Sequence, residues 1–244
     1  MSSAAEQVLS HFAGHSPQES LGAPEFIYNE LGFSSKVEML DFLRNKAVLD
    51  VGSGAGGIAR ETYLNRIDAT IISLNPRFAW EGYKARLQQY YNLYALDRLT
   101  SDSALLSEAS VVHDSHAVAA FGCSLPFTDH SFNLIIDNKG AIYHTLITDN
   151  YDQIFPEHGY TSSYNPNLEL LDQTLIDYYR VLASGGEARI GGIIKSDVRG
   201  KDCTVDILVH LDQLDIPYTI SDIYDKDDVA RKKVKYCLIT IHKA

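Results

Sequence analysis

Apolar and polar residues follow two different periods along this chain. Short, almost continuous apolar runs alternate with longer stretches in which apolar residues recur every three to four positions. The first pattern is typical of buried strands and the second of amphipathic helices. Their regular alternation from position 46 onward predicts βαβ units, and therefore a parallel sheet with helices packed on its faces.

The expected strands are 47–51, 69–74, 118–121, 132–136, 188–194, 218–224 and 235–242. The expected helices are 57–65, 77–93, 168–182 and 205–214, with an extra helix near 103–109. The charged link between the last two strands is too short for a crossover helix, so these strands should pair antiparallel. The sequence thus predicts an α/β fold: a Rossmann-like three-layer sandwich with a mostly parallel seven-stranded sheet and an antiparallel C-terminal hairpin.

No Pro-rich or Ser-rich linker divides the 244 residues, so we expect a single domain, 1–244. Residues 1–45 contain amphipathic stretches at 6–12 and 35–43, which predict an N-terminal helical cap. Residues 145–167 interrupt the alternation with aromatic and turn-forming residues. Long loops in compact domains are usually functional or mobile, so this segment is expected to be a lid-like insertion.

Composition narrows the expected partners and location. A net charge of −11 gives no general attraction to nucleic acid or to a membrane surface, which leaves a small molecule as the expected partner. The cysteines are widely separated and odd in number, which suits a reducing compartment. No apolar run approaches membrane-spanning length, and the N-terminus lacks the features of a signal peptide. We therefore expect a cytoplasmic protein, whose oligomeric state the composition does not specify.

Glycines cluster directly after the first expected strand, at positions 52, 54, 56 and 57. Glycine is favoured where a strand turns sharply into a helix and a ligand approaches the backbone. This spacing also satisfies the dinucleotide-binding fingerprint, but a nicotinamide dinucleotide would need an acidic residue where Asn75 stands. Asp50 favours a ligand with an amino-acid end, because a carboxylate orients an ammonium group and repels a pyrophosphate.

With these residues the sequence resembles the class I S-adenosylmethionine-dependent methyltransferases, whose first motif is an acidic residue followed by Gly-x-Gly-x-Gly. Asp50 and the glycines at 52, 54 and 56 fill that motif. Residues 125–135 resemble the family's Leu-Pro-Phe, acidic, Ser-Phe-Asp-Leu segment, and 179–186 resemble its helix end and turn before the fifth strand. The resemblance covers roughly residues 46–195 and implies S-adenosylmethionine as the cofactor.

The resemblance also implies where the cofactor lies. Relatives usually carry carboxylates that meet the ribose and the adenine, whereas this chain has Asn75 and no carboxylate at 119–124. We expect Leu74 and Phe121 to sandwich the adenine and Asn75 to bond a ribose hydroxyl. The expected cofactor-binding residues are Asp50, Gly52, Ser53, Gly54, Gly56, Leu74, Asn75, Phe121, Gly122 and Asp137.

Methyl transfer from a sulfonium is an in-line displacement, so alignment and a dry pocket supply much of the rate. An oxygen or nitrogen acceptor must still lose a proton. His144 is the expected general base because histidine titrates near neutral pH, with Asp137 as orienter or alternate base. The plainer alternative is that His144 only caps a helix or faces solvent.

The insertion and the N-terminal cap are expected to close over the carboxyl ends of the strands, where open α/β sheets bind ligands. Their aromatic residues suit a flat or partly apolar substrate, although any single tyrosine has a plainer role in packing. The expected substrate-binding residues are Tyr28, Tyr143, His158 and Tyr160. No metal site is expected, because His113 and His116 lack a third partner at recognisable spacing.

The function predicted from these features is methyl transfer from S-adenosylmethionine to oxygen or nitrogen of a small molecule, as in small-molecule biosynthesis. Two alternatives stay open. One is an enzyme of the same fold with non-methyl chemistry, such as cyclisation or elimination. The other is a non-catalytic methyltransferase-like partner subunit, for which the missing acidic contacts would be the reason.

Overall fold

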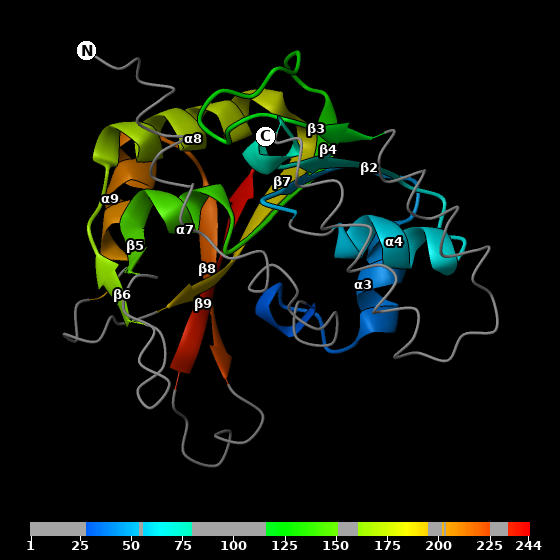
Figure 1. Ribbon diagram of the computed structural model, residues 1–244, viewed down its shortest axis with the longest axis horizontal. Coiled ribbons are helices and arrows are strands. Elements are labelled where there is room, and N and C mark those ends of the chain that lie inside the picture. The colour runs from blue at the N-terminus through cyan, green and yellow to red at the C-terminus, as the bar shows by residue number, and fades with distance from the viewer. Residues whose placement is uncertain are drawn as a thin grey trace.

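A computed structural model describes residues 28–53, 56–79, 116–150, 161–194, 202, 204–224 and 234–244. Its centre is a seven-stranded sheet in the order β3-β2-β1-β4-β7-β9-β8 (Figure 1). The strands are β1 (Ala47–Val51), β2 (Thr70–Leu74), β3 (Ala117–Val118), β4 (Phe132–Asn138), β7 (Leu182–Ile194), β8 (Tyr218–Tyr224) and β9 (Val234–His242). Strands β1 to β4 and β7 are parallel, whereas β9 runs antiparallel to β7 and β8. The predicted sheet, with its antiparallel C-terminal hairpin, is confirmed.

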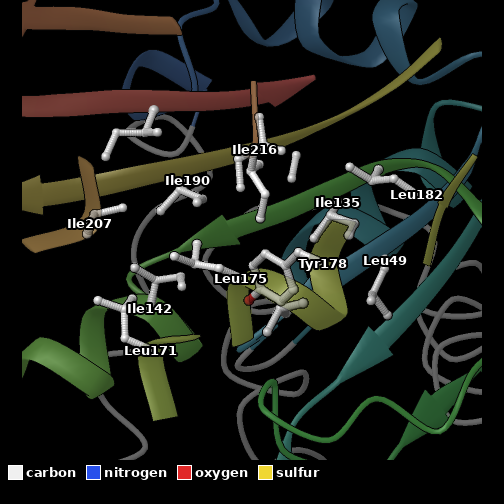
Figure 2. Packing of buried hydrophobic residues seen from close by; sticks show 14 of the residues in the cluster. Leu49, Ile135, Ile142, Leu171, Leu175, Tyr178, Leu182, Ile190, Ile207 and Ile216 are labelled. Carbon is white, nitrogen blue, oxygen red and sulfur yellow. The ribbon is translucent and has the colours of Figure 1, made fainter. Parts of the chain in front are cut away.

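Helices cover both faces of the sheet and complete three layers (Figure 1). One face carries α7 (Ala141–Leu146), α8 (Leu168–Val181) and α9 (Val205–Gln213), and the other carries α3 (Lys36–Leu43) and α4 (Gly57–Leu64). Side chains alternate along β1, so Leu49 packs in the core cluster beneath α8 and Val48 packs in the one beneath α3. Figure 2 shows the first of these clusters, in which Tyr178 of α8 lies among aliphatic side chains.

Local signals in the sequence set the ends of several helices. Ser35 caps α3, and its hydroxyl accepts a hydrogen bond from the Glu38 N–H at 3.1 Å. Asn167 caps α8 in the same way, through the Leu170 N–H at 3.2 Å. The residue before α4 is Gly56, with φ of 67°, a conformation that glycine adopts without strain. This left-handed residue turns the chain from β1 into α4.

Two expected strands differ from the observed ones. The strand expected at 118–121 is the shorter β3, which ends at Val118. Strand β7 starts at Leu182, directly after α8, so Gly185 and Gly186 lie within the strand instead of in a turn before it. The pairing of β4 with β7 shifts register near this point, which accommodates the two glycines.

Several expected helices lie wholly or partly outside the described residues. The 3-10 helix η2 (Pro76–Ala79) occupies the start of the helix expected at 77–93, and the rest of that stretch is not described. The helices expected at 6–12 and 103–109 also fall outside the described residues. No helix within the described part of the chain is long and apolar enough to cross a membrane.

The insertion at 145–167 contains a hairpin. Strands β5 (Ile147–Asn150) and β6 (Thr161–Tyr164) pair antiparallel in a second, two-stranded sheet. The N–H groups of Asn165 and Asn167 donate to the carbonyls of Leu146 and Thr145, at 2.9 and 2.7 Å, and fix the base of the hairpin to α7. A role as a lid stays a prediction.

Candidate functional site

Three turns converge at the carboxyl-terminal edge of the sheet. They follow β1, β3 and β4, and each has a glycine where it touches a neighbouring turn: Gly52, Gly122 and Gly140. A Cβ atom on Gly52 would lie 2.6 Å from the Cα of Gly140, and one on Gly122 would overlap the Cβ of Ala141. The turns after β1 and β4 therefore pack backbone against backbone, and the turn after β3 packs on the first residue of α7. The chain's own packing requires Gly52, in addition to any ligand that approaches it.

The described amides of the glycine-rich turn are already hydrogen-bonded. The N–H groups of Gly52 and Ser53 donate to the Leu74 carbonyl at the end of β2, at 2.8 and 3.3 Å. The Gly56 N–H donates to the Ser53 carbonyl at 2.8 Å. The first two bonds join the turn to β2, and in this structure none of these three N–H groups is left for a ligand. Gly54 lies outside the described residues.

Asp50 is the principal ionisable group of this turn. Its side chain lies at the end of β1 with 5% of the residue exposed, and it makes no hydrogen bond to any residue that the structure describes. Burial and the nearby Asp137 carboxylate raise the pKa of Asp50 to about 8. A buried carboxylate to which no described residue donates suits a cationic ligand.

Asp137, by contrast, is fully hydrogen-bonded. Its Oδ1 accepts from the Gly140 N–H at 2.8 Å, and its Oδ2 accepts from the Ile142 N–H at 3.0 Å and the Tyr178 hydroxyl at 2.6 Å. Burial raises its pKa to about 6, against the opposing effect of the Tyr178 hydroxyl and the two amides. Asp137 thus fixes the turn and the start of α7. To act as a base or a cofactor ligand it would have to release one of these donors.

His144 lies on α7, where its N–H donates to the Gly140 carbonyl at 3.2 Å. Its ring packs edge-on against the ring of Tyr143, with centroids 5.4 Å apart, and its Nδ1 is buried. Tyr143 is itself 8% exposed and belongs to the core cluster beneath α8. Tyr28 packs against the opposite cluster, beneath α3. The structure thus gives Tyr143 and Tyr28 packing roles, and their contact with a substrate stays a prediction.

The residues expected around the adenosine end follow β2 and β3. Asn75 is 8% exposed, and its N–H donates to the Val118 carbonyl at 3.1 Å, which brings the two strand ends together. Leu74 is completely buried in the core, so it offers no exposed surface to an adenine ring in this structure. Phe121 and Gly122 lie in the turn that packs on α7. Two expected substrate residues, His158 and Tyr160, lie outside the described residues.

The described end of the N-terminal cap docks beside this edge. The chain reverses at Gly32, with φ of 80°, and the Phe33 N–H donates to the Tyr28 carbonyl at 2.8 Å, as in a helix C-terminal cap. The Arg189 guanidinium donates to the Leu31 carbonyl at 2.9 Å. The Lys139 ammonium contacts the Glu30 carboxylate at 2.8 Å. Two cations therefore hold the end of this segment against β7 and the turn after β4.

Several residues that shape this edge could not be recognised from the sequence. Tyr178 was expected only as part of a helix, and nothing in its spacing links it to Asp137, 41 positions away. The Glu30–Lys139 ion pair spans 109 positions. The role of Gly140 could have been predicted from the sequence, because a glycine shortly after an aspartate at a strand end is typical of a turn whose backbone N–H donates to the aspartate side chain. Within the described ranges, no three His, Cys, Asp or Glu side chains form a group that could hold a metal ion.

No model of a protein family matches the sequence, and no curated protein matches it. Solved structures do match. One is the 1,6-didemethyltoxoflavin-N1-methyltransferase of Burkholderia thailandensis, with bound 1,6-didemethyltoxoflavin and S-adenosylhomocysteine. Its sequence is 13% identical to this one and its TM-score is 0.51. The match covers 98% of this chain and 86% of that one.

Two further structures match at comparable levels. The [4+2]-cyclase SpnF is 14% identical with a TM-score of 0.50, over 97% of this chain and 94% of that one. A predicted O-methyltransferase from Agrobacterium tumefaciens, protein Atu636, is 12% identical with a TM-score of 0.50, over 89% of this chain and 79% of that one. The chain thus has the fold of the class I S-adenosylmethionine-dependent methyltransferases, as the sequence predicts. The fold is shared by a cyclase, so it does not specify the reaction.

Proposed function

We propose that this protein is a methyltransferase that takes its methyl group from S-adenosylmethionine and transfers it to oxygen or nitrogen of a small molecule in the cytoplasm. The observation that carries the proposal is the buried Asp50 carboxylate, without a hydrogen-bond partner among the described residues, at the start of the glycine-rich turn. A cation beside it would favour its ionised form and compensate its burial. The methionine end of the cofactor supplies such a cation, its ammonium group.

The residues present fit this cofactor at one end better than at the other. At the amino-acid end, Asp50 is accompanied by the Ser53 hydroxyl, which is buried and has no hydrogen-bond partner among the described residues. At the adenosine end, Asn75 offers an amide in place of a carboxylate. An amide both donates and accepts, so it can bond a ribose hydroxyl without adding charge. We infer that affinity is concentrated at the amino-acid end.

The bound cofactor supplies an electrophilic methyl group on a sulfonium. The chain's own residues would then act in three ways. Asp50 holds the ammonium group, and the Asp137 hydrogen bonds keep the turn after β4 in place. His144, on α7 next to that turn, accepts the proton that the acceptor loses. Because Asp137 is occupied by three donors, His144 is the better candidate for the base.

Calorimetry with S-adenosylhomocysteine tests the cofactor assignment. The wild-type protein should bind it, and Asp50→Asn should weaken binding by about tenfold to a hundredfold, because a hydrogen-bonded charge is lost without loss of volume. Asp41→Asn is the matched control, since its carboxylate is 58% exposed on α3. Failure of the wild-type protein to bind either S-adenosylmethionine or S-adenosylhomocysteine would refute the proposal and favour a non-catalytic subunit.

Transfer of a labelled methyl group from S-adenosylmethionine to pooled small-molecule alcohols, phenols and amines tests the reaction itself. His144→Ala should leave the affinity for S-adenosylhomocysteine unchanged and slow the transfer by about a hundredfold or more, as for loss of a general base. An unchanged rate would remove His144 from the mechanism. Tight cofactor binding without transfer to any acceptor would favour the cyclisation or elimination chemistry that the likeness to SpnF suggests.

A further inference from the structure

A second polar side chain lies beside Asp50 on the neighbouring strand. Ser73 of β2 is the register partner of Asp50 of β1, so the two side chains point to the same face of the sheet. Ser73 is completely buried, and its hydroxyl has no hydrogen-bond partner in the part of the chain that the structure describes. Register partners on adjacent strands have Cβ atoms only about 5 Å apart. The hydroxyl is thus a close neighbour of the carboxylate.

Buried polar atoms without a hydrogen-bond partner are rare in folded proteins, because each one destabilises the folded chain. Here the Ser73 hydroxyl, which has no hydrogen-bond partner in the described part of the chain, stands beside the Asp50 carboxyl, to which no described residue donates, in a core where alanine or valine would pack without this cost. A hydroxyl rotates about its C–O bond and can donate to a carboxylate that becomes ionised. The pair therefore has a ready way to satisfy both groups, once Asp50 carries its charge.

We propose that Ser73 is a positioning residue for Asp50: its hydroxyl donates to the Asp50 carboxylate when that carboxylate is ionised against the ammonium group of the cofactor. This inference rests on the proposed function. Ser73 lies too deep to contact a ligand directly, so it acts through Asp50 alone. The backbone is held for this task, because the Ser73 N–H donates to the His116 carbonyl at 3.0 Å.

No other charged group that the structure describes near Asp50 is seen to donate a hydrogen bond to its carboxylate. Asp137 of β4 opposes its ionisation. On α4, the titratable side chains are Arg60, Glu61 and Tyr63, and Glu61 is bound to Lys36 of α3 at 2.9 Å. None of these side chains contributes to the pKa shift of Asp50, which burial and Asp137 account for. Strand β2 has no titratable residue, so its contribution to Asp50 is the neutral Ser73 hydroxyl.

The test is the pH dependence of S-adenosylhomocysteine binding, measured by calorimetry from about pH 7 to pH 9.5, where Asp137, with a pKa of about 6, is mostly ionised. Four proteins are compared: wild type, Ser73→Ala, Ser73→Thr, and Ser221→Ala as a matched control on an exposed serine of β8. The ligand's own titration is common to all four and cancels in the ratio of each variant's affinity to that of the wild type. Thermal melting checks that each variant is folded.

Ser73→Ala should bind about tenfold more weakly near pH 7, the effect of raising the Asp50 pKa by about one unit, and the difference should shrink toward pH 9.5. Ser73→Thr, which keeps the hydroxyl, should restore most of the affinity, and Ser221→Ala should match the wild type. If Ser73→Ala bound as tightly as the wild type at every pH, or more weakly by the same factor at every pH, the inference would be overturned. The proposal that the protein binds the cofactor would still stand. No binding by the wild type would overturn the proposed function, and this inference with it.

Discussion

Substitution of Gly140 by alanine tests the backbone contact at the centre of the site. Gly140 does not have a positive φ, so alanine can adopt its backbone conformation and only the added methyl group matters. That Cβ would lie 2.5 Å from Oδ1 of Asp137 and nearer still to the Val51 carbonyl. Ordinary contact needs about 3.5 Å, so the turn must move by about 1 Å. The movement also stretches the Gly140 N–H bond to Asp137.

Overpacking of this kind costs about 1–3 kcal/mol, and a chain of this length loses about 2–4 °C of Tm per kcal/mol. We therefore expect Gly140→Ala to melt about 2–12 °C below wild type by differential scanning calorimetry, with an equal m value in urea. Gly57→Ala is the matched control: its Cβ would meet only the end of the Arg60 side chain, at 3.9 Å, so it should be neutral or slightly stabilising. If Gly140→Ala were as stable as Gly57→Ala, the two turns would not be packed as described.

Three further changes give distinct outcomes. Asp50 has a pKa of about 8 in the folded chain against 3.8 ordinarily, so its burial lowers the stability of the wild type as pH rises between those values. In ligand-free urea denaturation, the free energy of unfolding of Asp50→Asn should therefore increase relative to that of the wild type across this pH window. A difference between the two proteins that is the same at every pH would refute the raised pKa. Tyr178→Phe removes one donor from Asp137, and should lower the free energy of unfolding at pH 8 by about 1.5–3 kcal/mol; a loss below about 0.5 kcal/mol would contradict the hydrogen bond. Glu30→Gln breaks the ion pair with Lys139, whose side chain is 42% exposed, so Tm should hardly change. Amide hydrogen exchange at the end of the N-terminal cap should become faster. Unchanged exchange there would show that the ion pair does not hold the cap in place.

The inner strands of the sheet were predictable because they are buried on both faces. Strand β1 has four buried residues of five, which gives a short apolar run interrupted only by Asp50, and its predicted bounds match the observed ones. Strand β3 has only two residues, both half-buried, so its periodic signal is too short to fix its end. The early start of β7 was missed because Gly185 and Gly186 read as a turn, whereas they lie in a register shift opposite β4.

The candidate site was predictable only where its residues are close in sequence. Asp50 and the glycines after it form one short motif, and those that the structure describes, Gly52, Gly56 and Gly57, lie between β1 and the start of α4; their contact with a cofactor stays a prediction. The partners of Asp137 come from the next turn and from α8, and no spacing in the sequence pairs that carboxylate with the Tyr178 hydroxyl. The same holds for Ser73, whose position beside Asp50 depends on the β1–β2 register.

The two cations that hold the N-terminal cap also bear on the order in which the chain folds. The Arg189 bond to Leu31 joins residues 158 positions apart, and the Lys139 pair with Glu30 joins residues 109 positions apart. A growing chain emerges from its N-terminus, so the cap is synthesised long before either partner. Contacts of such sequence separation form late, after the loops they close have been shortened by more local structure. The two contacts that hold the end of the cap are thus among the later ones to form, after β7 has joined the sheet.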